Sequence, residues 1–277
     1  MTAPTDKSER VFILGLGFQK CGTSWIYKYL QQSRFFNGGF DKEYHIWDGV
    51  DVPLLEYNLE SEPGLWDKIT RGNRYRRHQM QTDENEYFEY FTSLYDNEAS
   101  ITADITPSYS ALSETRMSAI IDGFRDRGVS CKALLLIRDP VDRIKSAVRY
   151  NLDREYYKEG IASGETSFPV ALEKYYMTEH CSLRTRYDDT LERVYSVFPR
   201  EDVYVGIYEN MFQRAQIAKI SKFIGIDENY EFSKVRVNKT KSEVEDFPNL
   251  EGKIMEFYKP VYEYCNEVFP ETRDLWR

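Results

Sequence analysis

The apolar residues of this chain gather in four short runs separated by longer amphipathic stretches. The runs are VFILGL at 11–16, SITADI at 100–105, KALLLI at 132–137 and VYVGIY at 203–208. The first, third and fourth are almost continuously apolar, which is typical of strands buried on both faces of a parallel sheet. The pattern therefore predicts four strands in the core of the protein.

The stretches between these runs have the periodicity of helices. Helices are expected at 113–126, 139–152, 190–198, 214–225 and 250–268. The first would carry on one face the apolar residues Met117, Ile120, Ile121 and Phe124. Asp139 followed by Pro140 is a favourable helix start, Gly225 is a favourable end, and Pro260 interrupts the last helix. Strands alternating with helices indicate an α/β fold, in a single domain with a central parallel sheet flanked by helices.

Two segments depart from this alternation. Residues 1–10 are polar and are expected to form a flexible tail. Residues 11–277 are expected to form one domain, because no linker interrupts them. Within it, segment 49–98 is rich in Tyr, Glu, Asn and Arg and has no clean period. We interpret it as an excursion on the substrate side of a cleft, whose tyrosines suggest an aromatic-lined acceptor pocket.

Charge and cysteine usage exclude several classes of protein. The formal net charge of −9 argues against nucleic-acid binding. No run approaches the roughly 18–20 apolar residues of a membrane-spanning helix, and the N-terminus lacks the apolar core of a signal peptide. The 4 cysteines are widely spaced and there are only 3 histidines, so no metal site is expected. We expect a cytoplasmic protein with reduced thiols.

The first apolar run leads into a glycine-rich loop, within VFILGLGFQKCGTSWIYKYL at 11–30. Gly17 and Gly22 have the spacing of a nucleoside-triphosphate loop, but Thr23 stands where that loop has its lysine. Lys20 lies inside the turn instead, beside the position of a shorter 5′-phosphate. From the loop alone, two interpretations are open: a strand–turn–helix with a surface lysine, or an anion site at a helix N-terminus.

A second stretch, KALLLIRDPVDRIKS at 132–146, favours the anion site. It predicts a buried strand, Arg138 at the carboxyl end of that strand, and a capped helix with Ser146 two turns in. Ligands of open α/β sheets bind at the carboxyl ends of strands. Arg138 can bind a phosphate with its guanidinium fork, and Ser146 can donate its hydroxyl. Two phosphate sites suggest a nucleotide with phosphates at its 5′ and 3′ positions.

Five motifs together resemble the sulfotransferases that use 3′-phosphoadenosine 5′-phosphosulfate (PAPS). FQKCGTSWIYKYL resembles their 5′-phosphosulfate loop, and LIRDPVDRIKSAVRY resembles their 3′-phosphate motif. KEYHIWD at 42–48, DITPSYS at 104–110 and FPREDVYVGIYENM at 198–211 resemble segments of the branch with heparan sulfate sulfotransferases and bacterial relatives. The resemblance covers roughly residues 11–225. It departs at Gln19, where proline or arginine is common in the family, and Cys21 stands at a position that varies in the family.

The resemblance implies roles for particular residues. Lys20 would meet the oxygen that bridges phosphorus and sulfur, Glu43 would be the catalytic base, and Lys42 would reach the sulfuryl oxygens. His45 would be a second base or a ligand of the acceptor, and Asp48 would orient its neighbours. The residues implied in nucleotide binding are Lys20, Cys21, Gly22, Thr23, Ser24, Trp25, Arg138, Ser146, Tyr208, Lys239, Thr240 and Lys241.

The acceptor and two rival functions stay open. The branch suggests a hydroxyl or amine of a sugar, lipid or other small metabolite, with Ser108 and Tyr109 near the cleft. Tyr187 is expected to contact the nucleotide or the acceptor. One rival is a P-loop small-molecule kinase, which would require a lysine at position 23. The other is a nucleotide-binding module without catalysis, which the presence of Lys20, Glu43 and Arg138 together disfavours. The sequence leaves the oligomeric state open.

Overall fold

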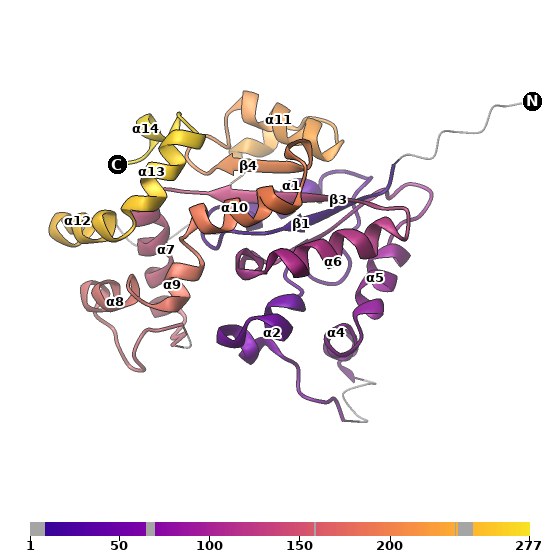
Figure 1. The fold of residues 1–277 in the computed structure, drawn as a ribbon, viewed down its shortest axis with the longest axis horizontal. Helices are drawn as coiled ribbons and strands as arrows, with labels where there is room; N and C mark the ends of the chain where they lie inside the picture. Colours follow the sequence, from indigo (N-terminus) through magenta and orange to yellow (C-terminus); the bar gives the residue numbers. More distant parts are fainter. Residues whose placement is uncertain (1–8, 65–69, 158, 236, 238–245) are drawn as a thin grey trace, which may run out of the picture.

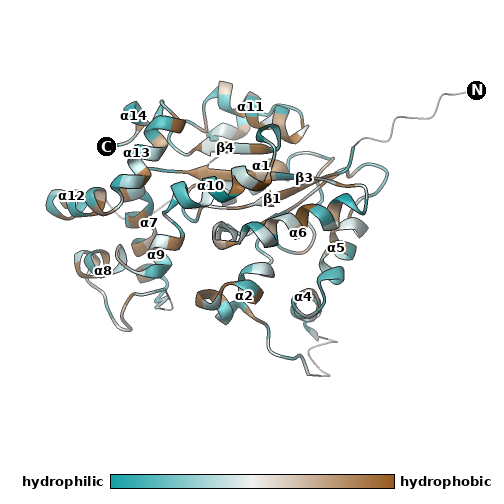
Figure 2. Ribbon diagram, viewed as in Figure 1, coloured by the Kyte–Doolittle hydropathy of each residue, from teal (hydrophilic) through white to brown (hydrophobic). Residues whose placement is uncertain are grey.

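The computed structural model describes residues 9–64, 70–157, 159–235, 237 and 246–277. It has a four-stranded parallel sheet in the order β2-β1-β3-β4. The strands are β1 (Val11–Gly15), β2 (Ile101–Ile105), β3 (Ser130–Ile137) and β4 (Val203–Ile207). They coincide with the four apolar runs, so the predicted α/β fold with a central parallel sheet is confirmed. Figure 2 shows brown, apolar strands at the centre of the molecule.

Helices cover both faces of the sheet (Figure 1). One face is covered by α5 (Glu84–Ser93), α6 (Glu114–Arg125) and α10 (Tyr187–Val197), and the other by α1 (Thr23–Leu30) and α11 (Arg214–Ile224). Phe12 of β1 stacks on Phe124 of α6 with ring centroids 4.0 Å apart. On the opposite face, Tyr29 of α1 hydrogen-bonds Ser221 of α11. The expected helix starts and ends hold: the Asp139 carboxylate accepts the Asp142 N–H, and Gly225 has a φ of 89°.

The remaining helices lie around this layered core. They are α2 (Trp47–Asp51), α4 (Gly72–Thr82), α7 (Pro140–Asp153), α8 (Phe168–Tyr175), α9 (Glu179–Leu183), α12 (Pro248–Phe257), α13 (Lys259–Val268) and α14 (Thr272–Leu275). Short 3₁₀ helices are η1 (Pro53–Asn58), η2 (Pro107–Ala111), η3 (Arg200–Asp202) and η4 (Tyr230–Lys234). The helix expected at 250–268 divides into α12 and α13, with Pro260 in the first turn of α13. No helix in the described part of the chain is long and apolar enough to cross a membrane.

Segment 49–98 contributes mainly to the core. Tyr87, Phe88 and Phe91 of α5 are buried against Phe12 and Phe124. Aromatic residues supply large buried areas and favourable edge-to-face contacts, so this cluster holds α5 and α6 on the sheet. The described part of the segment includes α2, α4 and α5, and most of its aromatic side chains pack inward rather than toward the pocket. Its place on the substrate side stays a prediction.

Gly15 sets the closest approach between β1 and β2. A Cβ atom at this position would lie 2.7 Å from the Ile105 Cα, which is a backbone atom that cannot move aside cheaply. We predict that Gly15→Ala lowers the free energy of unfolding by about 1–3 kcal/mol through overpacking. Urea denaturation followed by circular dichroism would measure the change.

Gly252 provides the matched control. It lies inside α12, where an added Cβ atom would have no neighbour within 4 Å among the described residues. Gly252→Ala is expected to leave the protein unchanged or to stabilise it by about 0.5–1 kcal/mol, because alanine loses less backbone entropy in a helix. Equal destabilisation by both substitutions would contradict the proposed close contact at Gly15.

Candidate active site

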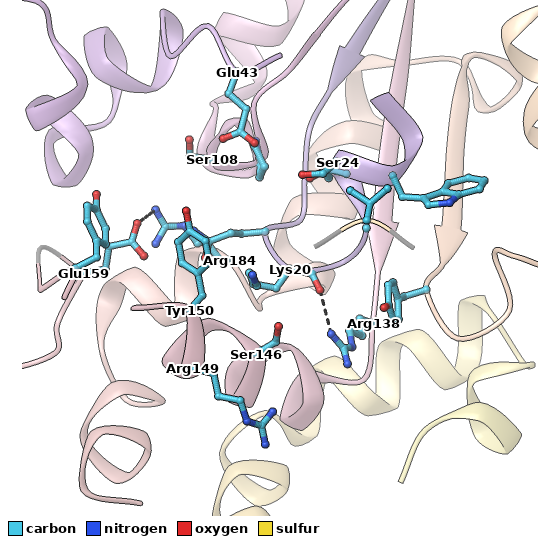
Figure 3. Close-up of a pocket in the computed structure, with 18 of the residues that line it drawn as sticks. Lys20, Ser24, Glu43, Ser108, Arg138, Ser146, Arg149, Tyr150, Glu159 and Arg184 are labelled. Atoms are coloured by element: carbon cyan, nitrogen blue, oxygen red, sulfur yellow. Dashed lines mark hydrogen bonds and ion pairs between the residues drawn. The ribbon is translucent and has the colours of Figure 1, made fainter. Parts of the chain in front are cut away.

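A pocket of about 720 Å³ opens at the carboxyl ends of the strands. Its walls come from the loop after β1, the segment around Glu43, the turn after β2, the first helix after β3, and the residues that follow β4. Parallel strands place their carboxyl ends at one edge, so segments far apart in sequence meet there. Figure 3 shows Lys20 near the centre, Arg138 on one side, and Glu43 pointing toward the pocket from above.

The loop after β1 has the backbone shape of an anion cradle. Gly22 precedes α1 with a φ of 99°, and a Cβ there would meet the Met211 sulfur at 2.9 Å. A residue with a side chain would be strained and crowded at this position. The N–H groups of Gly22, Thr23 and Ser24 have no hydrogen-bond partner among the described residues, and all three residues line the pocket. These groups and the helix dipole favour a bound anion.

Lys20 lies inside this turn and points across the pocket. Its Nζ is 4.2 Å from the centroid of the Tyr150 ring, and its carbonyl oxygen accepts a hydrogen bond of 3.3 Å from Arg138. Burial, together with the nearby charges of Arg138, Arg154 and Arg143, lowers the pKa of Lys20 to about 8. An anion placed between Lys20 and Arg138 would relieve this repulsion.

Arg138 lies at the end of β3, where its guanidinium packs 4.4 Å from the Tyr208 ring centroid. Its Nε is buried without a hydrogen-bond partner among the described residues. The next residue, Asp139, is held by the C-terminal segment: its carboxylate accepts the Arg277 N–H at 2.9 Å and the Tyr262 hydroxyl at 3.2 Å. Ser146 lines the same wall two turns into α7.

Lys42, Glu43, His45 and Asp48 form a continuous chain of charged contacts. The Lys42 Nζ contacts both Glu43 Oε1 and the Thr23 hydroxyl. His45 Nε2 lies 3.6 Å from Glu43 Oε2, and His45 Nδ1 lies 2.8 Å from the buried Asp48 carboxylate. Ser108 and Asn58 also donate to Asp48.

Contacts in this chain control the charge of its members. Burial alone would raise the pKa of Glu43, but His45 and Lys42 outweigh it and lower the pKa to about 2. Burial alone would lower the pKa of His45, but Asp48 and Glu43 raise it to about 10. At neutral pH, His45 is therefore an imidazolium between two carboxylates.

Asp104, at the end of β2, holds the backbone that presents Glu43. Its fully buried carboxylate accepts hydrogen bonds from the hydroxyls of Thr106, Tyr109 and Tyr87 and from the Tyr44 N–H. Burial raises the pKa of Asp104 to about 6, although these donors oppose the rise. A lone acidic residue in the apolar run SITADI was the signal in the sequence that could have identified it.

The other residues singled out in the sequence lie in several places. Trp25 lines the pocket but is 3% exposed, stacked on Tyr29, with its indole N–H donating to the Val235 carbonyl. The Cys21 side chain, expected among the nucleotide contacts, is instead buried in the core against the Tyr187 hydroxyl. The turn that directs Lys20 toward the pocket directs Cys21 into the core. There, buried Tyr187 contacts both Cys21 and Phe18 of the turn. Lys239, Thr240 and Lys241 lie outside the described residues.

Several pocket residues were not anticipated from the sequence. Arg149 and Tyr150 follow Ser146 by three and four positions, so all three share one face of α7. That spacing was readable in the sequence. Arg184 and Glu159 also line the pocket (Figure 3), but both lie outside periodic segments and no pattern pairs them.

In the described ranges, no group of three or more His, Cys, Asp or Glu side chains is placed to hold a metal ion.

Comparison with known proteins identifies the family. The profile of the sulfotransferase domain matches residues 8–251, and no curated protein sequence matches the chain. A sulfotransferase from Alicyclobacillus acidocaldarius superposes with a TM-score of 0.60 and 21% identity, over 94% of this chain and 95% of that one. The sulfotransferase domain of the Synechococcus PCC 7002 olefin synthase superposes with a TM-score of 0.50 and 13% identity, over 92% of this chain and 97% of that one.

A mouse sulfotransferase complexed with PAP gives a TM-score of 0.49 and 13% identity, over 98% of this chain and 89% of that one. Because their identities are below 25%, the Alicyclobacillus and Synechococcus structures bear on the fold alone, whereas the profile match shows the family. That match spans the loop after β1, the β3–α7 turn and the residues that follow β4, all of which contribute to the pocket lining. The chain therefore belongs to the sulfotransferase domain family and is a sulfotransferase enzyme.

Proposed function

We propose that the enzyme transfers the sulfuryl group of PAPS to a hydroxyl or amine of a small acceptor. The observation that carries this proposal is the convergence on one pocket, opposite Glu43, of Lys20, Arg138 and the N–H groups of Gly22 to Ser24, which have no partner within the described ranges. When bound, PAPS supplies a sulfuryl group activated by its bond to a phosphate. Arg138 Nε, which has no partner in the part of the chain that the structure describes, and the N–H groups of the loop fit the two phosphate groups of this nucleotide.

Each end of the nucleotide has a distinct set of ligands in this proposal. The loop N–H groups, Thr23 and Ser24 hold the 5′-phosphate. Arg138 and Ser146 hold the 3′-phosphate, and the ring of Tyr208 keeps the Arg138 guanidinium in place. Lys20 donates to the oxygen that leaves with the phosphate, because negative charge develops there during transfer.

Glu43 accepts the proton of the acceptor hydroxyl as that oxygen attacks. In the free protein, His45 and the Lys42 ammonium that contacts its carboxylate together hold the pKa of Glu43 low. Lys42 also contacts Thr23, so its ammonium lies between the base and the phosphate loop. Movement of Lys42 toward the sulfuryl oxygens would release Glu43 and raise its pKa, so that base strength increases when the donor is bound.

His45 positions Glu43 in this proposal and does not act as a second base. Because its pKa is raised to about 10, the ring is already protonated at neutral pH and has no lone pair to accept a proton. It donates to Asp48 on one side and faces Glu43 on the other. Asp48, which is fully buried, thus fixes the orientation of the ring.

Replacement of the base tests catalysis separately from binding. Glu43→Gln keeps the size of the side chain but cannot accept a proton. We expect turnover of PAPS to fall by about 10²–10⁴-fold, the usual contribution of general base catalysis, with little change in affinity for adenosine 3′,5′-bisphosphate (PAP). Release of PAP from PAPS in the presence of a metabolite extract measures turnover. Glu86→Gln is the control, because Glu86 pairs with Arg76 and lies outside the pocket lining. Undiminished turnover by Glu43→Gln would contradict the proposed role of Glu43.

The pKa of Lys20 predicts how nucleotide affinity varies with pH. The free enzyme loses the Lys20 proton near pH 8, whereas a bound phosphate stabilises the charged amine. The association constant for PAP is therefore expected to fall above about pH 8, by up to about tenfold per pH unit. Isothermal titration calorimetry from pH 7 to 9.5 measures this fall. The whole range lies above the phosphate pKa of about 6, so protonation of the phosphates does not contribute to the change.

Two comparisons complete that experiment. Lys20→Arg keeps its charge throughout this range, so its affinity for PAP should not vary with pH in the same way. Identical pH profiles for the two proteins would exclude Lys20 as the titrating group. Titration with ATP and magnesium separates the kinase alternative, because a PAPS enzyme should bind PAP much more tightly than ATP.

The charge of His45 can be measured directly. We expect the His45 ring to give the NMR shifts of an imidazolium from pH 6 to 9, because two carboxylates hold its proton. His180 should be neutral over most of this range, because burial and nearby Arg184 lower its pKa. His45→Gln and His180→Gln assign the resonances. Titration of His45 between pH 6 and 7.5 would instead favour its role as a base.

A further inference from the structure

The pocket contains a second buried charged group on the side away from Arg138. Arg184 Nη2 lies 2.7 Å from Glu159 Oε1, and the two side chains are 5% and 4% exposed. Arg184 follows α9, whereas Glu159 lies in the connection between α7 and α8. Both line the pocket, and Figure 3 shows the pair at the opposite side of Lys20 from Arg138.

This ion pair is only partly satisfied. Glu159 Oε2, Arg184 Nε and Arg184 Nη1 are buried and have no hydrogen-bond partner in the described part of the chain. Buried polar atoms normally have partners, and a half-satisfied buried network costs stability. Because these atoms belong to residues that line the pocket, a ligand group can supply what they lack.

The chemistry of the pair selects the ligand group. The free carboxylate oxygen requires a donor, whereas the free guanidinium N–H groups require an acceptor. An ammonium only donates and would be repelled by Arg184. A carboxylate only accepts and would be repelled by Glu159. A hydroxyl donates one hydrogen bond and accepts two, so it satisfies both partners without adding charge.

The pair adjoins the catalytic chain through its neighbours. Tyr57 contacts Arg184, and Tyr156 contacts Tyr57. Both tyrosines line the pocket and offer ring surface for the C–H groups of a ligand. Asn58, next to Tyr57, donates to Asp48, which holds His45 beside Glu43. A ligand between these groups would thus reach both Glu43 and Arg184.

We propose that Arg184 and Glu159 form an acceptor subsite that binds a second hydroxyl of the acceptor, distinct from the hydroxyl that is sulfated. The acceptor is then a neutral molecule with at least two hydroxyls, such as a polyol or saccharide. This inference rests on the proposed function, because Glu43 and the PAPS site define where the first hydroxyl lies. The donor side of the pocket is cationic, whereas the charges of Arg184 and Glu159 balance each other.

A series of simple alcohols tests the subsite without knowledge of the natural acceptor. The probes are α,ω-alkanediols of three to eight carbons, each compared with the 1-alkanol, amino-alcohol and hydroxy-acid of equal length. Sulfation is measured with PAPS labelled with ³⁵S. At one or more lengths we expect kcat/KM for the diol, corrected for its two equivalent hydroxyls, to exceed that of each matched probe by about tenfold or more, as expected for a hydrogen bond to charged groups.

Variants assign the preference to the pair. Glu159→Gln should reduce the preference for the diol over the alkanol to less than about threefold and change the Kd for PAP by less than about twofold. Glu159→Gln leaves Arg184 without its charged partner, so the double variant Glu159→Gln with Arg184→Met, which removes both charges, is measured as well. It should show the same loss of diol preference and the same small change in the Kd for PAP. Arg116→Gln is the control, because its ion pair with Asp51 lies outside the pocket lining.

The outcomes separate the subsite from the function on which it rests. Equal use of diols and alkanols by the wild-type enzyme, or a preference for amino-alcohols or hydroxy-acids, would overturn the subsite. An unchanged diol preference in both variants would do the same. If no probe is sulfated, saturation-transfer NMR of the diols with the PAP complex decides: absence of binding overturns the subsite. Failure to bind PAP would instead overturn the proposed function.

Discussion

The architecture of the pocket depends on holding cations close together without carboxylate partners. Lys20 and Arg138 have no acidic side chain within 4 Å among the described residues, although the protein carries a net charge of −9. Aromatic rings and carbonyl groups hold them instead: Tyr150 for Lys20, Tyr208 and the Lys20 carbonyl for Arg138. The repulsion that remains in the free enzyme favours an anion, so part of the binding energy is prepared by the fold.

The opposite wall uses a different principle, because its charges alternate. Lys42, Glu43, His45 and Asp48 form a chain in which each charge meets its opposite. Such a chain orients Glu43 but also weakens it as a base, since both neighbours stabilise its charged form. Lys42 also contacts Thr23 of the phosphate loop, so in the proposed mechanism a bound anion draws the ammonium away and leaves His45 as the remaining cation beside Glu43. In this mechanism, donor binding and base strength are coupled through Lys42.

Features that depend on local sequence patterns were predictable, whereas contacts between segments far apart in the sequence were not. Strands buried on both faces and the cap at Asp139 are local patterns, so they were predicted closely. The loop glycines and Arg138 were predicted because phosphate binding demands particular backbone and side-chain chemistry at strand ends, and Gly22 and Arg138 both line the pocket. The pairing of Arg184 with Glu159 joins two irregular segments, and no periodicity reveals such a contact. Composition also could not separate tyrosines that line the pocket from those, such as Tyr87, that fill the core.

The two sides of the pocket impose different requirements on their ligands. On the proposed donor side, Lys20 and Arg138 attract a polyanion, so in this proposal selection depends on the spacing between the loop after β1 and Arg138. On the acceptor side, Arg184 and Glu159 cancel in charge but leave directional hydrogen-bonding atoms unsatisfied. Selection there comes from the pattern of donors and acceptors, which a charged group cannot match and an apolar group leaves unpaired. Under both proposals, the donor is recognised by charge and the acceptor by the polarity of its hydrogen bonds, with Lys20 between them.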